Sequence, residues 1–228
     1  AQTYPREAYE VLVVDNGSTD ATPQVVREMA IASLLVEPTP GSYQARNLGI
    51  REARGDYVAF TDADCLPDTD WLEAAARAAL AHPSAVLLAG QVNLYRVGEG
   101  RMACENYERL FAFDQARNVR NGVAVTANWM SPRDTLVAAG GFNGKLKSGG
   151  DYDLSRRLSR EGGQIVYVED MRVRHPVRAS FAELASKTRR VTGGRLTGSD
   201  SAVGIAGWFF RLGKDCLRRL NTIAWATL

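Results

Sequence analysis

The sequence predicts an α/β fold in which a mostly parallel sheet is flanked by helices. Two short apolar runs, Val11–Val14 and Tyr57–Thr61, have the composition of strands in such a sheet. Each is followed by acidic or turn-forming residues and then by a segment with helical spacing. Alternating strands and helices are typical of repeated βαβ units. Since such sheets bind ligands at the carboxyl ends of their strands, we expect the functional residues there.

The first half of the chain carries the clearer strand and helix signals. Ser18, Thr19 or Asp20 can cap a first helix that contains Pro23 in its first turn, and Gly55 follows the second helix. The expected strands are 11–14, 34–36, 57–61 and 86–89, and the expected helices are one running through residue 29, 43–53 and 71–80.

The second half is less regular, and residues 98–126 give mixed signals. Helices are expected from Ser131-Pro132 to the Gly140-Gly141 pair, over 151–161 and over 180–190, with a strand at 165–168. The stretch 193–201 has the composition of a linker. We therefore expect one domain over 1–192, followed by a linker and a helical tail over 193–228.

Composition restricts the class of protein. The chain has 228 residues, 45% of them hydrophobic, and a net charge of +2, which suits one globular domain and gives no reason to expect nucleic acid as a partner. Cys65, Cys104 and Cys216 form no CxxC pair, so a zinc site or disulfide framework is not expected. Reduced thiols, no signal peptide and no membrane-spanning run favour a cytoplasmic location.

Asp62 and Asp64 form a DxD pair directly after the strand 57–61. If the chain stays extended there, both carboxylates point to the same side. Carboxylate oxygens are ligands for hard cations such as Mg²⁺ or Mn²⁺, which can in turn bind diphosphate oxygens. A solvated loop is the alternative, because DxD is a short and common pattern.

Other candidate residues have both a functional and a structural interpretation. The two are of equal standing for Asp15, whereas for Arg46, Asp151 and His175 the residues alone favour the structural one. Asp15 can bind a base or ribose, or simply form the turn after the first strand. Arg46 can bind a phosphate or lie at the surface. Asp151 can act as a general base or cap the helix that it begins. His175 can ligate a metal or pack in the core.

These residues lie in motifs that resemble family 2 of the inverting glycosyltransferases. The resemblance begins at residues 10–20 (EVLVVDNGSTD) and continues at 41–72, with the ARN and DAD motifs, and at 140–175, with the D-x-D-L motif. Together these stretches cover most of residues 1–180. The order of the motifs is specific to that family.

The resemblance implies a GT-A fold, which is a nucleotide-binding sheet joined to an acceptor-binding half. By motif position it assigns donor binding to Asp15, Arg46 and Asp62, and the metal to Asp64 and His175. It assigns the acceptor side to Asn128, Asp153 and Arg157, and general-base catalysis to Asp151.

Two departures from the family pattern affect these expectations. The family usually has a further strand and helix before the point that corresponds to the start of this sequence, so the expected domain is N-terminally incomplete. The family also often has Glu-Asp where this chain has Gly150-Asp151. The base is retained but its acidic neighbour is not, and the handling of the acceptor is expected to differ.

The implied reaction moves a sugar, typically a hexose, from a nucleotide-diphosphate sugar to an acceptor hydroxyl with inversion, using Mn²⁺ or Mg²⁺. The expected donor is a UDP-sugar, and the expected acceptor is a glycan or lipid-linked molecule of polysaccharide or glycolipid biosynthesis. A nucleotidyltransferase and a non-catalytic nucleotide-sugar or partner-binding module are the alternatives. Pyrophosphate release would distinguish the first, and binding without turnover the second.

The tail over 203–228 is interpreted separately. It carries Trp208, Phe209 and Phe210 among basic residues. An amphipathic helix of this kind can bind an anionic membrane, here the inner face of the cell membrane, or pack its apolar side on the domain. The sequence favours neither.

Overall fold

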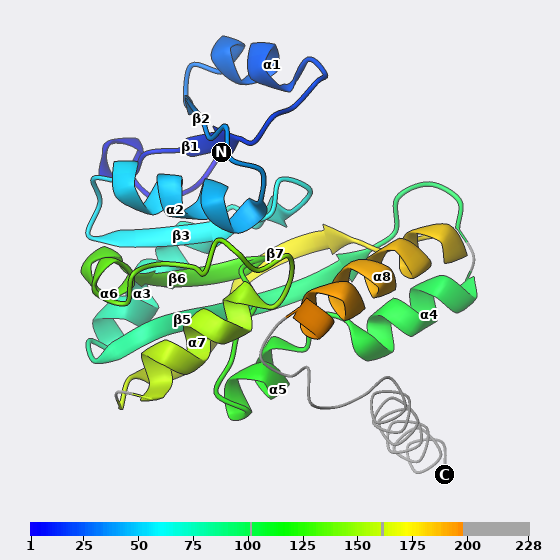
Figure 1. Cartoon of the computed structure of the whole chain (residues 1–228). Coiled ribbons are helices and arrows are strands. Elements are labelled where there is room, and N and C mark those ends of the chain that lie inside the picture. Colours follow the sequence, from blue (N-terminus) through cyan, green and yellow to red (C-terminus); the bar gives the residue numbers. More distant parts are fainter. Residues whose placement is uncertain (101, 161, 198–228) are drawn as a thin grey trace.

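The computed structural model describes residues 1–100, 102–160 and 162–197. Two sheets form (Figure 1). In the first, β1 (Leu12–Asp15) pairs in parallel with β2 (Ser33–Val36). The second has the strand order β3-β6-β5-β7-β4. Its strands are β3 (Tyr57–Thr61), β4 (Leu66–Pro67), β5 (Ala85–Tyr95), β6 (Asn128–Pro132) and β7 (Gln164–Pro176).

Strand directions confirm the expected α/β class. β3, β5 and β7 run the same way, whereas β6 is inserted antiparallel between β3 and β5, and β4 pairs antiparallel with β7. Sequence analysis did not identify β6, because its five residues, NWMSP, are too short and too mixed for a periodic signal.

Helices connect and cover these strands. They are α1 (Thr22–Glu28), α2 (Ser42–Glu52), α3 (Trp71–Ala81), α4 (Met102–Phe111), α5 (Gln115–Arg120), α6 (Arg133–Ala138), α7 (Gly150–Arg160) and α8 (Phe181–Thr197), with a 3₁₀ turn η1 (Arg6–Ala8). The ambiguous region 98–126 therefore contains α4 and α5. Helix α8 continues through residues 193–197, the first part of the expected linker.

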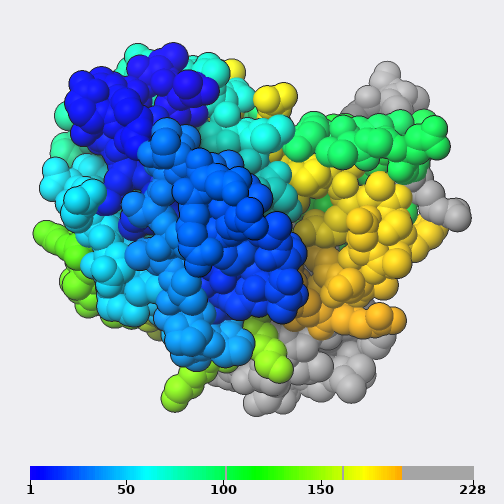
Figure 2. Space-filling model, turned by 90° about the horizontal axis from the view of Figure 1, so that it is seen from above, coloured from blue at the N-terminus to red at the C-terminus, as the bar shows by residue number. Residues whose placement is uncertain are grey.

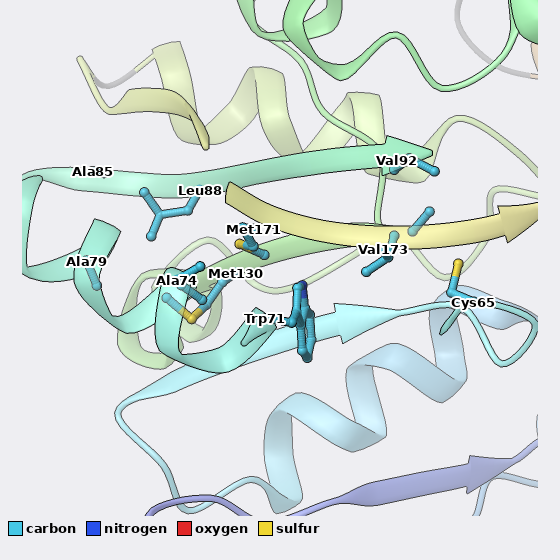
Figure 3. Packing of buried hydrophobic residues seen from close by; sticks show 12 residues of the cluster. Cys65, Trp71, Ala74, Ala79, Ala85, Leu88, Val92, Met130, Met171 and Val173 are labelled. Atoms are coloured by element: carbon cyan, nitrogen blue, oxygen red, sulfur yellow. The ribbon is translucent and has the colours of Figure 1, made fainter. Parts of the chain in front are cut away.

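Two apolar clusters lie on opposite faces of the five-stranded sheet. Leu87 and Leu88 are consecutive in β5 and belong to different clusters, as the alternation of side chains in a strand requires. One cluster packs α3 against the sheet through Trp71 and the alanines of that helix (Figure 3). The other packs α2, α6 and α7 on the opposite face.

Two helices, α4 and α8, form a pair that lies outside the sheet near the carboxyl end of β7. In Figure 1, α8 runs beside α4, and Figure 2 shows the orange surface of α8 on the side of the molecule away from most of the blue N-terminal surface. Glu108 of α4 is fully buried and pairs with Arg178, just after β7, and with Lys187 of α8, each at 2.8 Å. This ion triad joins the pair to the end of β7.

The tail 203–228 and its two interpretations lie outside the described residues. Within the described part of the chain, none of the helices has the length and apolar character needed to cross a membrane.

Candidate active site at the strand ends

The DxD pair forms a turn directly after β3. The amide of Cys65 donates to the carbonyl of Asp62 at 2.9 Å, so the extended form that would point both carboxylates to one side does not persist. Instead, Asp62 accepts a hydrogen bond from Arg46 of α2 at 2.9 Å, and Asp64 faces His175 with 3.5 Å between Oδ2 and Nε2. The two carboxylates thus have different partners, Arg46 for Asp62 and His175 for Asp64.

His175, near the end of β7, is oriented by its surroundings. It is buried, and its Nδ1 lies 2.7 Å from the carbonyl oxygen of Pro176, which can only accept a hydrogen bond. In a neutral imidazole the proton therefore lies on Nδ1, and Nε2 is the unprotonated nitrogen that faces Asp64. The ring of Phe113 packs against the imidazole with 4.4 Å between centroids. This arrangement presents Nε2 as a ligand atom.

A third ligand atom lies close by. The ligand atoms of Asp64, Cys65 and His175 are all within 4.8 Å of one another. Burial raises the pKa of the Cys65 thiol to about 11, so the sulfur stays protonated at neutral pH. Mn²⁺ and Mg²⁺ prefer oxygen ligands, and Mn²⁺ also accepts imidazole. The exposed carboxylate of Asp64 and the fixed Nε2 of His175 therefore fit such an ion, with Asp64 open to further ligands from solvent or substrate.

Asp151 lies in the first turn of α7, after Gly149 in a left-handed conformation with φ of 79°. Burial raises the pKa of Asp151, and the positive charge of Arg46 partly offsets that effect. A partly buried carboxylate with a raised pKa is the type of group that serves as a general base.

Arg46 connects the two halves of the site. It pairs with Asp62 at 2.9 Å, and its guanidinium lies 5.6 Å from the ring centroid of Tyr43. Its charge also acts on Asp151. The structure therefore brings Arg46 together with Asp62 and Asp151, and Asp64 with His175.

Asp15 belongs to the two-stranded sheet, at the carboxyl end of β1. It is buried, and its Oδ1 accepts a hydrogen bond from the amide of Ser18 at 3.2 Å. The next residue, Asn16, bonds to the carbonyls of Glu37 and Thr39 and accepts from the amide of Gly41. Asn16 thereby fixes the loop that leads into α2, a role that sequence analysis did not identify.

The three expected acceptor-side residues have structural partners. Asn128 is fully buried and accepts from Trp71 at 2.9 Å. Its amide nitrogen donates to the carbonyls of Gln91 and Met171. Both amide protons and one lone pair of the amide oxygen are thus used inside the protein, which favours a structural role for Asn128, and its acceptor-side role stays a prediction.

Arg157 pairs with Asp153 at 3.1 Å, one helical turn away, and also donates to the carbonyls of Ala139 and Gly141. These bonds tie α7 to the end of α6. The geometry assigns Asp153 and Arg157 to the support of the helix that carries Asp151.

Two residues that sequence analysis missed contact the expected site residues directly. Tyr43 contacts Arg46 and the start of α7, and Phe113 contacts His175. Tyr43 precedes the ARN motif and had only a helix boundary assigned to it. Phe113 is the one non-glycine residue with positive φ in the described ranges, at 55°. Such conformations cluster at functional sites, but sequence does not reveal them.

Comparison with known proteins gives three sets of matches. Residues 1–136 match the model of the family described as "Glycosyl transferase family 2". Glycosyltransferase AglE of Haloferax volcanii is 34% identical over 202 residues, which is 86% of this chain and 66% of that protein.

Among solved structures, Staphylococcus aureus TarS 1–349 with UDP-GlcNAc superposes with a TM-score of 0.59 at 20% identity, over 88% of this chain and 62% of that one. Mannosyltransferase PcManGT from Pyrobaculum calidifontis, in complex with GDP-Man and Mn²⁺, gives 0.62 at 25% identity, over 83% and 53%. The chain thus spans less than two thirds of the length of each of these proteins.

Proposed function

The chain belongs to glycosyl transferase family 2, and we propose that it transfers a sugar from a nucleotide-diphosphate sugar to an acceptor hydroxyl with inversion at the anomeric carbon. The observation that carries the proposal is the arrangement at the strand ends. There Asp64 faces His175 at 3.5 Å, and Arg46 joins Asp62 at 2.9 Å while its charge acts on Asp151. The proposed metal ligands thus form one pair, and Arg46 links Asp62 to the proposed proton acceptor.

On the donor side, Asp15 and Asp62 hold the nucleoside. Ionised carboxylates accept hydrogen bonds, which suits the N–H of a base and the hydroxyls of ribose. Arg46 keeps Asp62 in place and adds positive charge where the diphosphate approaches. Complexes of the similar proteins with UDP-GlcNAc and with GDP-Man support this class of donor, and we propose a UDP-sugar.

Asp64 and His175 would hold the divalent ion, Mn²⁺ or Mg²⁺. Such an ion supplies positive charge that stabilises a departing diphosphate. The hydrogen bond from Nδ1 of His175 to Pro176 keeps Nε2 available as a ligand atom. The Mn²⁺ in the PcManGT complex supports a metal of this type.

Asp151 accepts the proton of the acceptor hydroxyl. Its raised pKa makes the carboxylate a better base than an exposed aspartate, while the positive charge of Arg46 favours its ionised form. Asp153 and Arg157 hold the helix beneath it. The acceptor is proposed to be a glycan or a lipid-linked molecule, delivered at the inner face of the cell membrane if the tail 203–228 binds there.

The test is calorimetric titration of UDP-, GDP- and dTDP-sugars with and without Mn²⁺. We expect one nucleotide to bind only with metal, and the Asp64→Ala variant to lose that binding. Asp134→Ala is the matched control, because its side chain is fully exposed and the substitution removes the same charge. Release of a nucleoside diphosphate rather than pyrophosphate then identifies sugar transfer, and the anomeric configuration of the product, read by NMR, tests inversion.

Absence of binding by a folded chain would contradict the donor site. Binding that persists in Asp64→Ala would contradict the metal assignment. Binding without turnover of any donor would favour a non-catalytic module.

A further inference from the structure

The hydroxyl of Tyr43 caps the first turn of α7. The amide N–H of Gly150 donates to Tyr43 Oη at 2.9 Å in a buried setting, although 107 residues separate the two positions. The first amides of a helix have no partner within the helix, and side chains of nearby residues usually satisfy them. Here the cap comes from a different helix, α2.

Gly150 leaves the space that Tyr43 occupies. A Cβ atom at position 150 would lie 2.7 Å from two ring carbons of Tyr43, closer than real contacts allow. The ring also stacks on Phe142, with 5.6 Å between centroids and an interplanar angle of 15°. The tyrosine is therefore wedged between Phe142 and the backbone of α7, and any side chain at position 150 would displace it.

The residue that follows the cap is Asp151. Its backbone carbonyl accepts from the hydroxyl of Ser155 at 2.8 Å, and Ser155 in turn accepts from the amide of Ala124 at 3.0 Å. Ser155 and Tyr43 thus fix the backbone on both sides of the Asp151 side chain. Only Tyr43 is also in contact with Arg46, the group whose charge acts on Asp151.

We infer that Tyr43 is a positioning residue, whose hydroxyl holds the start of α7 through Gly150 and so directs the Asp151 carboxylate, with Arg46 held on the same ring. The inference rests on the proposed function, because it supposes that Asp151 is the base. Burial, aided by the negative charge of Asp151, raises the pKa of Tyr43, which keeps the phenol neutral at the pH of catalysis. A neutral hydroxyl can accept from Gly150 and keep its own proton.

The test is a double-mutant cycle between Tyr43→Phe and Asp151→Asn in the full chain. Phenylalanine keeps the ring and its stacking on Phe142 but removes the hydroxyl. The reaction followed is release of nucleoside diphosphate from UDP-N-acetylglucosamine and from GDP-mannose with water as acceptor, under single-turnover conditions. We expect Tyr43→Phe to lower the rate constant about 10-fold, with donor affinity unchanged, and to cost nothing further in the Asp151→Asn background.

Tyr152→Phe is the matched control, because Tyr152 lies on the same helix and its hydroxyl also makes a hydrogen bond, to Asn118 at 3.2 Å. It should leave the rate constant unchanged. An equal loss from Tyr43→Phe in both backgrounds would show a general structural role and overturn the inference, as would no loss in the wild-type background. An unchanged rate in Asp151→Asn alone would instead contradict the assignment of the base, so the two failures are distinguishable.

Discussion

Asp151 is held in conditions that suit its proposed chemistry and oppose the stability of the fold. Burial disfavours the ionised form of a carboxyl group, and Arg46, which offsets this, is already paired with Asp62 at 2.9 Å. One guanidinium group shared between two carboxylates offsets only part of the desolvation cost of each. The raised pKa of Asp151 therefore means that its ionised form costs folding free energy at neutral pH.

Asp151→Asn should accordingly stabilise the chain near neutral pH. Asparagine is nearly isosteric and removes the buried charge, and gains of about 0.5–2 kcal/mol are common for such changes. On a chain of this size that corresponds to a rise in Tm of about 1–8 °C. The pKa of Asp151 is raised on folding, so the wild type regains stability as pH falls toward the ordinary carboxyl range. The difference in Tm should shrink from about pH 8 to about pH 4.5.

Thermal unfolding followed by circular dichroism at several pH values measures this difference. Asp134→Asn, at a fully exposed position, should leave Tm within about 1 °C at every pH. A variant Asp151→Asn less stable than the wild type at neutral pH would show that the carboxylate makes a net stabilising contact.

At the scale of elements, the sequence predicts best where a local pattern determines structure. The runs at Val11–Val14 and Tyr57–Thr61 and the placement of the DxD pair at a strand end were readable, and each corresponds to the structure. The expected cap of the first helix was only partly right, because Asp20 accepts from the amide of Thr22 but the N-cap residue of α1 is Ala21. Strand β6 was not readable, because its position depends on pairing with β3 and β5 rather than on its own composition.

The same limit applies to the site. Asp64 and His175 are 111 positions apart, and only a family motif, not spacing, suggested that they meet. Tyr43 and Gly150 carry no chemical signal when read alone, since their significance is the contact between them. For Asn128, motif position suggested an acceptor contact, whereas the structure shows an amide with every polar group used internally.

Asn128→Ala tests this structural role. The substitution leaves the indole N–H of Trp71 and the carbonyls of Gln91 and Met171 without their partner. A buried polar group left unsatisfied costs about 1–3 kcal/mol, and relaxation reduces the sum, so we expect the free energy of unfolding to fall by about 2–5 kcal/mol. Urea titration measures it. Asn143→Ala removes one exposed hydrogen bond, from the amide of Lys145, and should change it by less than about 1 kcal/mol. An effect on donor or acceptor affinity without loss of stability would support the acceptor-side assignment instead.

At the scale of the whole molecule, the helical pair α4–α8 is connected to the proposed metal site by a series of contacts. Glu108 pairs with Lys187, whose ammonium lies 5.5 Å from the ring centroid of Phe113. Phe113 in turn packs on His175 at 4.4 Å. Burial alone would raise the pKa of Glu108, but the hydrogen bonds and charges of Lys187 and Arg178 outweigh it and lower that pKa. The carboxylate is therefore ionised, and its two cations are held beside the end of β7 that carries the proposed metal ligand His175.

Glu108→Gln should destabilise the helical pair α4–α8 and weaken metal binding at Asp64 and His175, which Glu108 does not contact directly. The change leaves Lys187 and Arg178 without a countercharge, and breaking a buried ion pair costs about 3–5 kcal/mol. Because the pKa of Glu108 is lowered on folding, its contribution is present at neutral pH and is lost as pH falls through the folded value. The stability of the wild type should thus fall more steeply in acid than that of the variant. In the variant, hydrogen exchange should be accelerated relative to the wild type in α4 and α8, and less so in β5.

The same variant should raise the Kd for Mn²⁺ several-fold, measured by electron paramagnetic resonance without donor. Phe113 is kept at φ of 55° by its surroundings, and release of Lys187 from α4 removes one of the groups that holds the ring on His175. Glu183→Gln is the control, since Glu183 lies on α8 but makes only exposed hydrogen bonds at the start of that helix. Glu108→Gln could instead destabilise α4 and α8 while Mn²⁺ affinity stays at the wild-type value. That result would show that the helical pair does not influence the proposed metal site and that Pro176 alone orients His175.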